Sequence, residues 1–307
     1  MATELIGGEQ ARRMSGTFSP YRVLVLARHT LTQLTRMRVF YFLGIFVAIL
    51  IASSMFVLRY NSPEQELKIL KDFGLGAMTL FVSVFAIVAT SMLIPKDVED
   101  RTLYTILSKP VLRIEYLLGK LLGVLMLIGV SLVVMDALFT GVLYWRQSMI
   151  TAEQVEVLRT GGHGEEAVEA LRMVIDAAGV SWSLQAAMLV VFAKGAVLAA
   201  LTLLISTFAS SSLFTIVVAI TAFFIGHVQA DARAFYEANE IGGGLMKYVA
   251  ALIALVCPDF QLFNVVDAAV AGELIAWGDV GMLLGAAGGY MVVYIMLAWY
   301  AFYDKEL

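Results

Sequence analysis

The sequence predicts an all-α protein that crosses a membrane several times, and three observations support this prediction. Of the 307 residues, 60% are hydrophobic and only 15% are charged, whereas soluble domains average about 25% charged residues. The mean hydropathy is +0.85. The apolar residues gather in runs of about 20, the length that a helix needs to cross the hydrocarbon core of a bilayer. Polar segments separate these runs.

Six membrane spans follow from the positions of these runs. They cover residues 39–58, 74–94, 117–144, 184–208, 213–228 and 277–302. The fourth and fifth spans come from one apolar stretch that is too long for a single crossing, so serines 210–212 are predicted as a tight turn between them. Residues 59–73 are predicted to be a charged connector. Pro95 is expected to end the second span, because proline disrupts the interior of a helix.

The polar segment 146–181 has too few apolar residues for a core of its own. Thr151 and Gln154 have the spacing of a capping box, which predicts that a short helix begins there. Glycines within 161–164 are expected to break the chain, and residues 165–177 predict a second helix.

Residues 245–257 are apolar but number only 13 before Pro258. About 17 residues are needed to cross the hydrocarbon core. Together with residues 260–271 they predict a re-entrant or interfacial helical hairpin on the outer side, between the fifth and sixth spans.

The N-terminal residues divide into a tail and a helix. Residues 1–19 are polar and lack the apolar core of a signal peptide, so they are expected to form a cytosolic tail. Residues 20–38 predict an amphipathic helix that lies in the membrane interface. Its two faces carry Leu24, Ala27, Leu31 and Leu34 on the apolar side and Arg22, His29, Gln33 and Arg36 on the polar side.

The distribution of Lys and Arg predicts the orientation of the spans. Basic residues are dense in the N-terminal helix and in segment 95–120, and sparse in the acidic segment 146–181. The positive-inside rule therefore places the N-terminus and segment 95–120 in the cytoplasm. With six spans both termini are cytosolic, and segments 146–181 and 229–276 face outward.

Segment 95–120 is the most charge-dense stretch between two apolar runs, and it is either a passive connector or a handle for a soluble partner. If residues 98–107 are helical, they form a partly apolar face. Pro110 would end that helix. A second helix is expected to begin near Ile114 and to run into the membrane.

This segment resembles the first cytoplasmic loop of ABC-2-type transporter permeases. The resemblance rests on the acidic residues, Thr102-Leu103, Leu107–Pro110, Arg113 and Leu118-Gly119-Lys120, on the six-span layout and on the final residues 302–307. Many members have Gly directly before the Thr-Leu pair. Arg101 stands there in this chain, which makes it look closer to the branch that contains the permease of the nitrous-oxide-reductase maturation transporter.

The resemblance implies a coupling helix in this loop that enters a groove of a separate ATPase subunit, and an elbow helix before the first span. It also implies that two permeases, either copies or paralogues, form the pathway and that two ATPase subunits bind ATP and Mg below them. The positions that match the coupling contact are Val98, Glu99, Asp100, Arg101, Thr102, Leu103, Ile106, Pro110 and Arg113.

The sequence lacks the motifs of several functional classes. The chain has no GxxxxGK[ST] phosphate-binding loop, no HExxH and no GxSxG. It is therefore expected to be neither an enzyme nor a metal or cofactor protein, with ATP and Mg on the partner ATPase. No basic patch interleaved with aromatic residues predicts nucleic-acid binding. Cys257 is the single cysteine, which excludes a disulfide within the chain.

Two charged residues fall inside predicted spans. Asp136 and Lys194 lie at similar depth, near 12–15 Å below the outer boundary at a rise of about 1.5 Å per residue. Because charges at membrane depth are costly, the two are predicted to pair across neighbouring helices. Such a pair would fix helix register or line a cargo path. The alternative is a Lys194 side chain that snorkels without a partner.

Small residues at four-residue spacing predict two close-packing faces, because they let another helix approach. These positions are Gly44, Ala48 and Ala52 in the first span and Gly281, Gly285 and Gly289 in the last.

Taken with the resemblance, these features predict the transmembrane permease subunit of an ABC exporter in a bacterial cytoplasmic (inner) membrane. Its expected partners are an ABC-type ATPase, a second permease, membrane lipid and an outer partner through segment 146–181. The cargo is not readable. Two other classes stay open: an ion-coupled secondary transporter or channel, motivated by Asp136 and Lys194, and a membrane scaffold subunit without transport.

Overall fold

A computed structural model of the chain describes residues 18–35, 40–56, 63–99, 111–209, 211–239 and 257–303. Within these ranges the regular structure is helical, without a strand. The all-α prediction is confirmed. The helices follow the chain in this order: α2 (Pro20–Thr35), α3 (Phe40–Phe56), α4 (Pro63–Ser91), α5 (Leu93–Glu99), α7 (Arg113–Thr160), α8 (Glu165–Ala178), α9 (Trp182–Phe208), α10 (Ser212–Asn239), η2 (Gln261–Phe263), α12 (Val266–Ala271) and α13 (Trp277–Tyr303).

Five helical stretches in the described part are long and apolar enough to cross a bilayer. They are Glu64–Glu99, Arg113–Thr160, Glu165–Phe208, Ser212–Gln229 and Trp277–Phe302. Helix α3 is also apolar throughout but has 17 described residues, and the residues on either side of it lie outside the described ranges. The protein is therefore polytopic, and the count of six spans stays a prediction.

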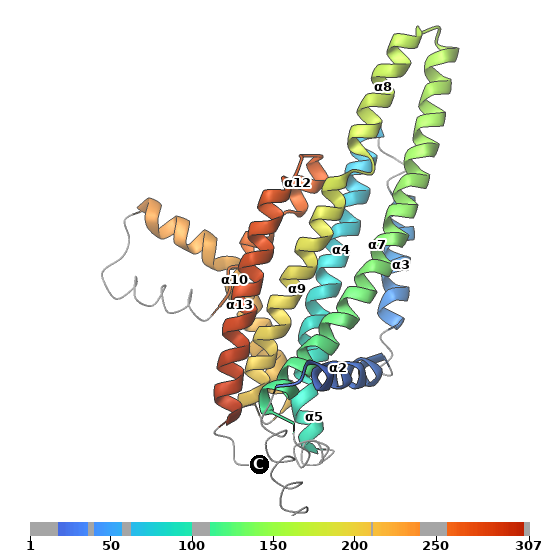
Figure 1. The fold of residues 1–307 in the computed structure, drawn as a ribbon. Coiled ribbons are helices and arrows are strands. Elements are labelled where there is room, and N and C mark those ends of the chain that lie inside the picture. Colours follow the sequence, from blue (N-terminus) through green and yellow to red (C-terminus); the bar gives the residue numbers. More distant parts are fainter. Residues whose placement is uncertain are drawn as a thin grey trace, which may run out of the picture.

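Helix α9 forms the centre of the bundle, with α13, α4, α7 and α10 packed around it (Figure 1). Its composition explains this position, because alanines and Gly195 allow neighbours to approach on every side. A Cβ added at Gly195 would collide with Val82 of α4. In the most apolar window of α9, 78% of the residues are buried, against 17% for α13. The outer helices thus keep wide apolar faces free within this chain.

Helix α2 lies across one end of the bundle, at a steep angle to the spans (Figure 1). Its buried residues are Ala27, Thr30 and Leu34, which face α7. Leu24, predicted on the apolar face, is exposed within the described chain, as a side chain that faces lipid would be. The approach to α7 is close because α7 has glycines at 119 and 123. An added Cβ would lie 2.5 Å from Leu26 Cβ at the first and 2.6 Å from Thr30 Cβ at the second.

At the opposite end, α7 and α8 project beyond the other helices as an antiparallel hairpin (Figure 1). Helix α7 has 48 residues, which is about 72 Å at 1.5 Å per residue and more than twice the hydrocarbon thickness of about 30 Å. The prediction that a helix begins at Thr151 is wrong. The Thr151 hydroxyl donates to the Gln147 carbonyl inside a continuous helix, because neither proline nor glycine occurs between Gly141 and Gly161.

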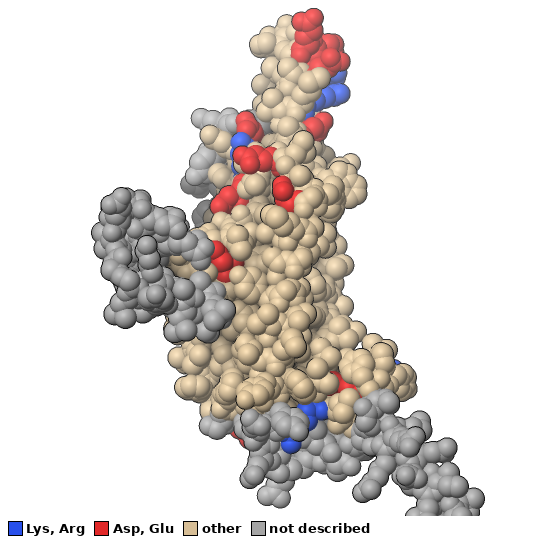
Figure 2. Space-filling view, turned by 60° about the vertical axis from the view of Figure 1, so that its left-hand side comes forward, with Lys and Arg blue, Asp and Glu red and all other residues tan. Residues whose placement is uncertain are grey.

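The projecting end of this hairpin is acidic (Figure 2). Residues 147–181 carry six carboxylates and two arginines. The turn at 161–164 and the second helix are confirmed, with α8 ending at Ala178. The base is held by Gln147, whose amide donates to Asp176 at 2.9 Å and accepts from the Val180 N–H at 3.2 Å.

Two predicted boundaries near the second span are corrected. The connector 59–73 is shorter than expected, because α4 already begins at Pro63, where proline suits the first helical turn. Pro95 does not end a helix. The chain turns at Met92, and Pro95 lies in the first turn of α5, where its missing N–H is not needed.

The predicted outer hairpin is described only from Cys257 onward, and residues 245–256 lie outside the described ranges. The described half turns beside α10, where the Phe260 N–H donates to the Gly226 carbonyl. It then forms α12, which packs on α4 and α9. Gly272, with φ of 82°, ends α12 in the left-handed region that favours glycine. Helix α10 continues to Asn239, beyond the predicted end of the fifth span.

Candidate functional site

The two flanks of segment 100–110 meet in a buried polar cluster at the α2 end of the bundle. Helix α5 leads into this segment and α7 leads out of it. Of the predicted coupling positions, Asp100, Arg101, Thr102, Leu103, Ile106 and Pro110 lie outside the described residues. Val98 and Glu99 are exposed at the end of α5, and Arg113 begins α7.

The centre of the cluster is an ion pair between the two flanks. Lys120 Nζ of α7 lies 2.6 Å from Asp97 Oδ2 of α5, and the two side chains are 1% and 4% exposed. The Tyr116 hydroxyl donates to the same carboxylate oxygen at 2.7 Å. Tyr116 and Lys120 are four residues apart and so lie on one face of α7. Lys120 also donates to Gln33 Oε1 of α2 at 3.4 Å, which brings a third helix into the cluster.

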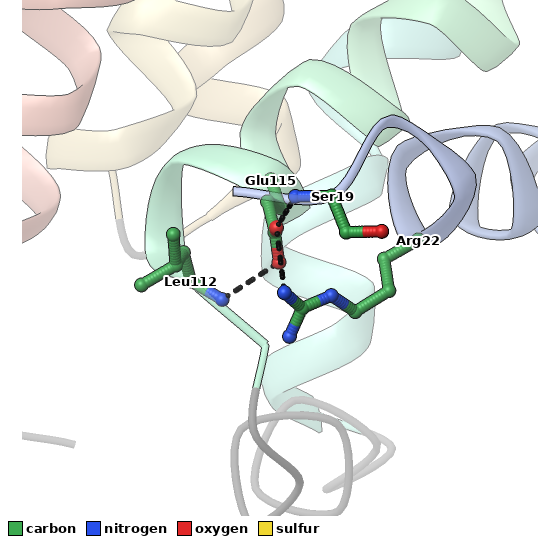
Figure 3. A network of polar contacts seen from close by, with 4 residues as sticks. All are labelled: Ser19, Arg22, Leu112 and Glu115. Carbon is green, nitrogen blue, oxygen red and sulfur yellow. Dashed lines mark hydrogen bonds and ion pairs between the residues drawn. The ribbon is translucent and has the colours of Figure 1, made fainter. Parts of the chain in front are cut away.

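Glu115 fastens the start of α2 to the start of α7 (Figure 3). Its fully buried carboxylate accepts the Ser19 N–H at 2.6 Å and the Leu112 N–H at 3.0 Å. The Arg22 guanidinium lies 3.3 Å from the same side chain. Glu115 is at the third position of α7, where a carboxylate satisfies free backbone donors and complements the helix dipole.

Arg113 connects the cluster to the end of α13. Its guanidinium donates to the Phe302 carbonyl at 2.7 Å and lies over the Phe302 ring, 5.9 Å from the centroid. The Tyr116 ring stacks on the same phenylalanine at 5.9 Å. Helices α2, α5, α7 and α13 are thus joined at one point, and segment 100–110 begins and ends there.

The cluster holds the two helices that flank segment 100–110 in a fixed relation. Buried, mutually bonded charges hold one geometry, because separating them would leave an uncompensated charge in an apolar surround. A displacement of segment 100–110 would therefore move α5 and α7 together. Within the described part of the chain, no group of three or more His, Cys, Asp or Glu side chains could hold a metal ion.

The predicted pair between Asp136 and Lys194 does not form among the described residues. Asp136 accepts a hydrogen bond at 3.4 Å from Thr140, one turn further along α7. Lys194 instead faces α10, with its Nζ 5.9 Å from the centroid of the Phe223 ring. The depth argument failed because depth does not determine the direction in which a side chain points around its helix.

The predicted small-residue faces make no close approach within the described chain. A Cβ at Gly44, Gly281, Gly285 or Gly289 would meet nothing within 4 Å, and Ala48 and Ala52 are exposed. Helix α13 packs on α9 through a different face, whose buried residues include Val280, Ala287 and Tyr294.

Sequence reasoning treated Asp97, Glu115 and Lys120 only as charges of a surface loop and did not place them in a buried cluster. Two signals were present. Tyr116 and Lys120 follow each other at a spacing of four, and Glu115 stands three residues after the residue that precedes α7. Gly119 and Gly123 form a further GxxxG pair, which marks where α2 docks.

The fold is that of a polytopic membrane protein. Its polar segment 100–110 lies between two helices, α5 and α7, that the buried cluster joins. The chain belongs to the ABC-2 transporter family: the family model described as ABC-2 family transporter protein matches residues 24–307. Membership in this family makes it an ABC transporter permease. A search of curated proteins finds no match.

Proposed function

We propose that this permease couples ATP hydrolysis by a separate ATPase subunit to export of a cargo across the bacterial cytoplasmic membrane. The observation that carries the proposal is the buried cluster of Asp97, Glu115, Tyr116 and Lys120, which joins the two flanks of segment 100–110, α5 and α7, to each other and to α2 and α13. Such a connection is what a force-receiving segment requires, since a loosely held loop would absorb the motion of a partner.

In this proposal the α2 end of the bundle faces the cytoplasm. The positive-inside argument supports this orientation, because the basic residues concentrate in residues 12–38 and in segment 95–120. Helix α2 then serves as the elbow helix at the inner surface. The acidic α7–α8 hairpin faces outward.

The motion would pass through the cluster in three directions. Movement of segment 100–110 pulls on α5 and, through the pair of Asp97 and Lys120, on α7. Glu115 transmits it to α2, and Arg113 transmits it to the last turn of α13. One contact with an ATPase would thus reorient several spans at once.

The proposed assembly contains a second permease, either a copy or a paralogue. The exposed apolar surfaces of α3 and α13 support it, since both carry small residues that no helix in the described ranges approaches. Gly281, Gly285 and Gly289 would allow close packing with a partner helix.

The test is to tag the chain in its native host, extract it gently and identify the ATPase that co-purifies. A triple variant, Glu99→Ala with Arg101→Ala and Leu103→Ala, is expected to lose this ATPase. The matched control is Glu165→Ala with Glu166→Ala and Glu169→Ala on the distant α8, which should keep it. Recovery of no ABC-type ATPase from membranes rich in the intact protein, or equal recovery with the coupling variant, would refute the proposal.

A further inference from the structure

A cavity of about 500 Å³ lies between α4, α10 and the α12 region, with Lys194 of α9 in its wall. It is separate from the polar cluster, because it lies beside residues 76–87 of α4, nearer the α12 end of the bundle. Its walls are mainly apolar, with Leu80 and Val84 of α4 facing Phe223 and Phe224 of α10. Cavities of this size commonly bury small molecules in proteins.

Lys194 is the unusual feature of this cavity. It is 7% exposed and lies 12 residues into a helix of 27, about 18 Å from its first residue at 1.5 Å per residue. Among the described residues it has neither a hydrogen bond nor an ion pair, and its Nζ lies 5.9 Å from the centroid of the Phe223 ring. A cation at membrane depth is costly without a counter-charge, and a ring face compensates for only part of that cost.

The other polar groups of the cavity do not supply this counter-charge. His227 Nδ1 is bonded to the Phe223 carbonyl at 2.8 Å. The Asp267 carboxylate accepts from the Asn264 amide at 3.1 Å and forms no ion pair with Lys194. Lys194 is therefore the group in the cavity wall that is left to attract an anion.

The cavity also reaches the outer surface of the chain. Leu80 and Phe224 in its wall are 67% and 63% exposed, so a molecule dissolved in the bilayer could enter sideways. We propose that this cavity binds a fatty carboxylate, with the carboxylate beside Lys194 and the hydrocarbon against Leu80, Val84 and Phe224. This binding does not depend on the proposed coupling to an ATPase.

The experiment uses the full chain in nanodiscs of phosphatidylcholine and a fatty acid that carries a photoreactive diazirine. Labelling is expected in peptides of α4 and α10. Oleate should compete with the probe, whereas methyl oleate, which has the same hydrocarbon without the charge, should compete about tenfold less well. Equal competition by the ester, or labelling that excess oleate does not reduce, would overturn the proposal.

The variants separate charge from packing. Lys194→Met should lower the labelling of α4 and α10 about tenfold, and Lys194→Arg should retain most of it. The matched control is Lys68→Met, because Lys68 pairs with Glu64 on the surface of α4, outside the cavity. Val84→Trp should block labelling by filling the cavity with Lys194 intact, which keeps the proposal testable if Lys194→Met fails to fold. Unchanged labelling in the folded Lys194→Met and Val84→Trp proteins would mean that another surface, such as an interface with a second copy, binds the probe.

Discussion

Lys120 and Asp97 form a buried ion pair between the two helices that flank segment 100–110, with Nζ and Oδ2 2.6 Å apart. One residue belongs to the helix that enters the segment and the other to the helix that leaves it. The pair therefore fixes the separation of the two flanks, whatever the segment between them does. The Tyr116 hydroxyl shares the carboxylate and completes the contact.

Breaking this pair from one side should destabilise the protein strongly. Asp97→Asn or Lys120→Met leaves a buried charge without its partner, which typically costs about 3–5 kcal/mol. The double variant should recover much of that loss, because neither charge remains. The measurement is unfolding of the four proteins in one detergent, followed by a double-mutant cycle.

The matched control for this cycle is the exposed pair of Glu64 and Lys68 on α4, which lies 2.6 Å apart but is open to solvent. Its removal should change stability by less than about 1 kcal/mol. If the losses from Asp97→Asn and Lys120→Met simply add in the double variant, the two side chains are not energetically coupled.

Glu115→Ala is expected to release α2 from α7. The variant removes the acceptor for the Ser19 and Leu112 N–H groups and the counter-charge of Arg22. Amide hydrogen exchange should therefore rise in α2 and in the first turn of α7. The distant α8 should exchange as before.

Glu115→Gln provides the comparison for this prediction. Its amide oxygen can still accept one backbone N–H but carries no charge for Arg22. Its effect should fall between those of the native protein and Glu115→Ala. Unchanged exchange in α2 for both variants would show that apolar packing alone holds this helix.

The sequence predicted where the membrane-spanning helices lie, but not how each helix is rotated about its own axis. Runs of apolar residues long enough to cross a bilayer predict helices under almost any packing, and the structure has helices at all six predicted spans. The Thr151 capping signature failed because such a signature begins a helix only where the preceding chain is not already helical. Asp136 and Lys194 failed as a pair because the direction of each side chain depends on tertiary packing.

The polar cluster could not be predicted for the same reason, because burial of its side chains also depends on tertiary packing. Its members come from both sides of segment 100–110, and the packing of α2 at Gly119 and Gly123 and of Phe302 on Tyr116 helps to enclose them. The spacings in α7 indicate a shared helix face, but they do not predict that Asp97 and Lys120 are buried. The proposed ATPase contact itself, at residues 100–110, stays a prediction.

The glycines of α7 and α13 should respond differently to enlargement. Gly119→Leu would drive a side chain into Leu26, so the variant should lose stability and the docking of α2. A Cβ at Gly285 meets no atom of the described residues within 4 Å, so Gly285→Leu should leave the stability of the monomer unchanged. If a second permease packs on α13, Gly285→Leu should lower the fraction of cross-linked dimer in membranes.

Gly141→Leu controls for this comparison, because that glycine also has open space around it among the described residues but lies on α7. Equal dimer fractions for the Gly285→Leu, Gly141→Leu and native proteins would exclude this face of α13 from the interface.

The projecting hairpin should be dispensable for the bundle but needed for an outer partner. The apolar contacts of its far half are local: Val155 and Val168 are buried where α7 and α8 pack together, whereas Ile150 and Ile175 at its base belong to the core of the bundle. Its surface combines the acidic end with exposed apolar side chains, including Met173 at 71% and Val157 at 58%. These features suit a basic partner with an apolar patch. Deletion of residues 155–170, with a short glycine linker in their place, should therefore leave expression and unfolding temperature nearly unchanged, while transport and recovery of the partner are lost.

A milder variant separates charge from shape in the same hairpin. Changing Glu165, Glu166 and Glu169 to Gln keeps the helix, because glutamine is a comparable helix former, but removes three of the six carboxylates. Recovery of an outer partner should fall with this variant and should depend on salt in the native protein. Normal transport and an unchanged set of co-purifying proteins after the deletion would exclude the hairpin from partner binding.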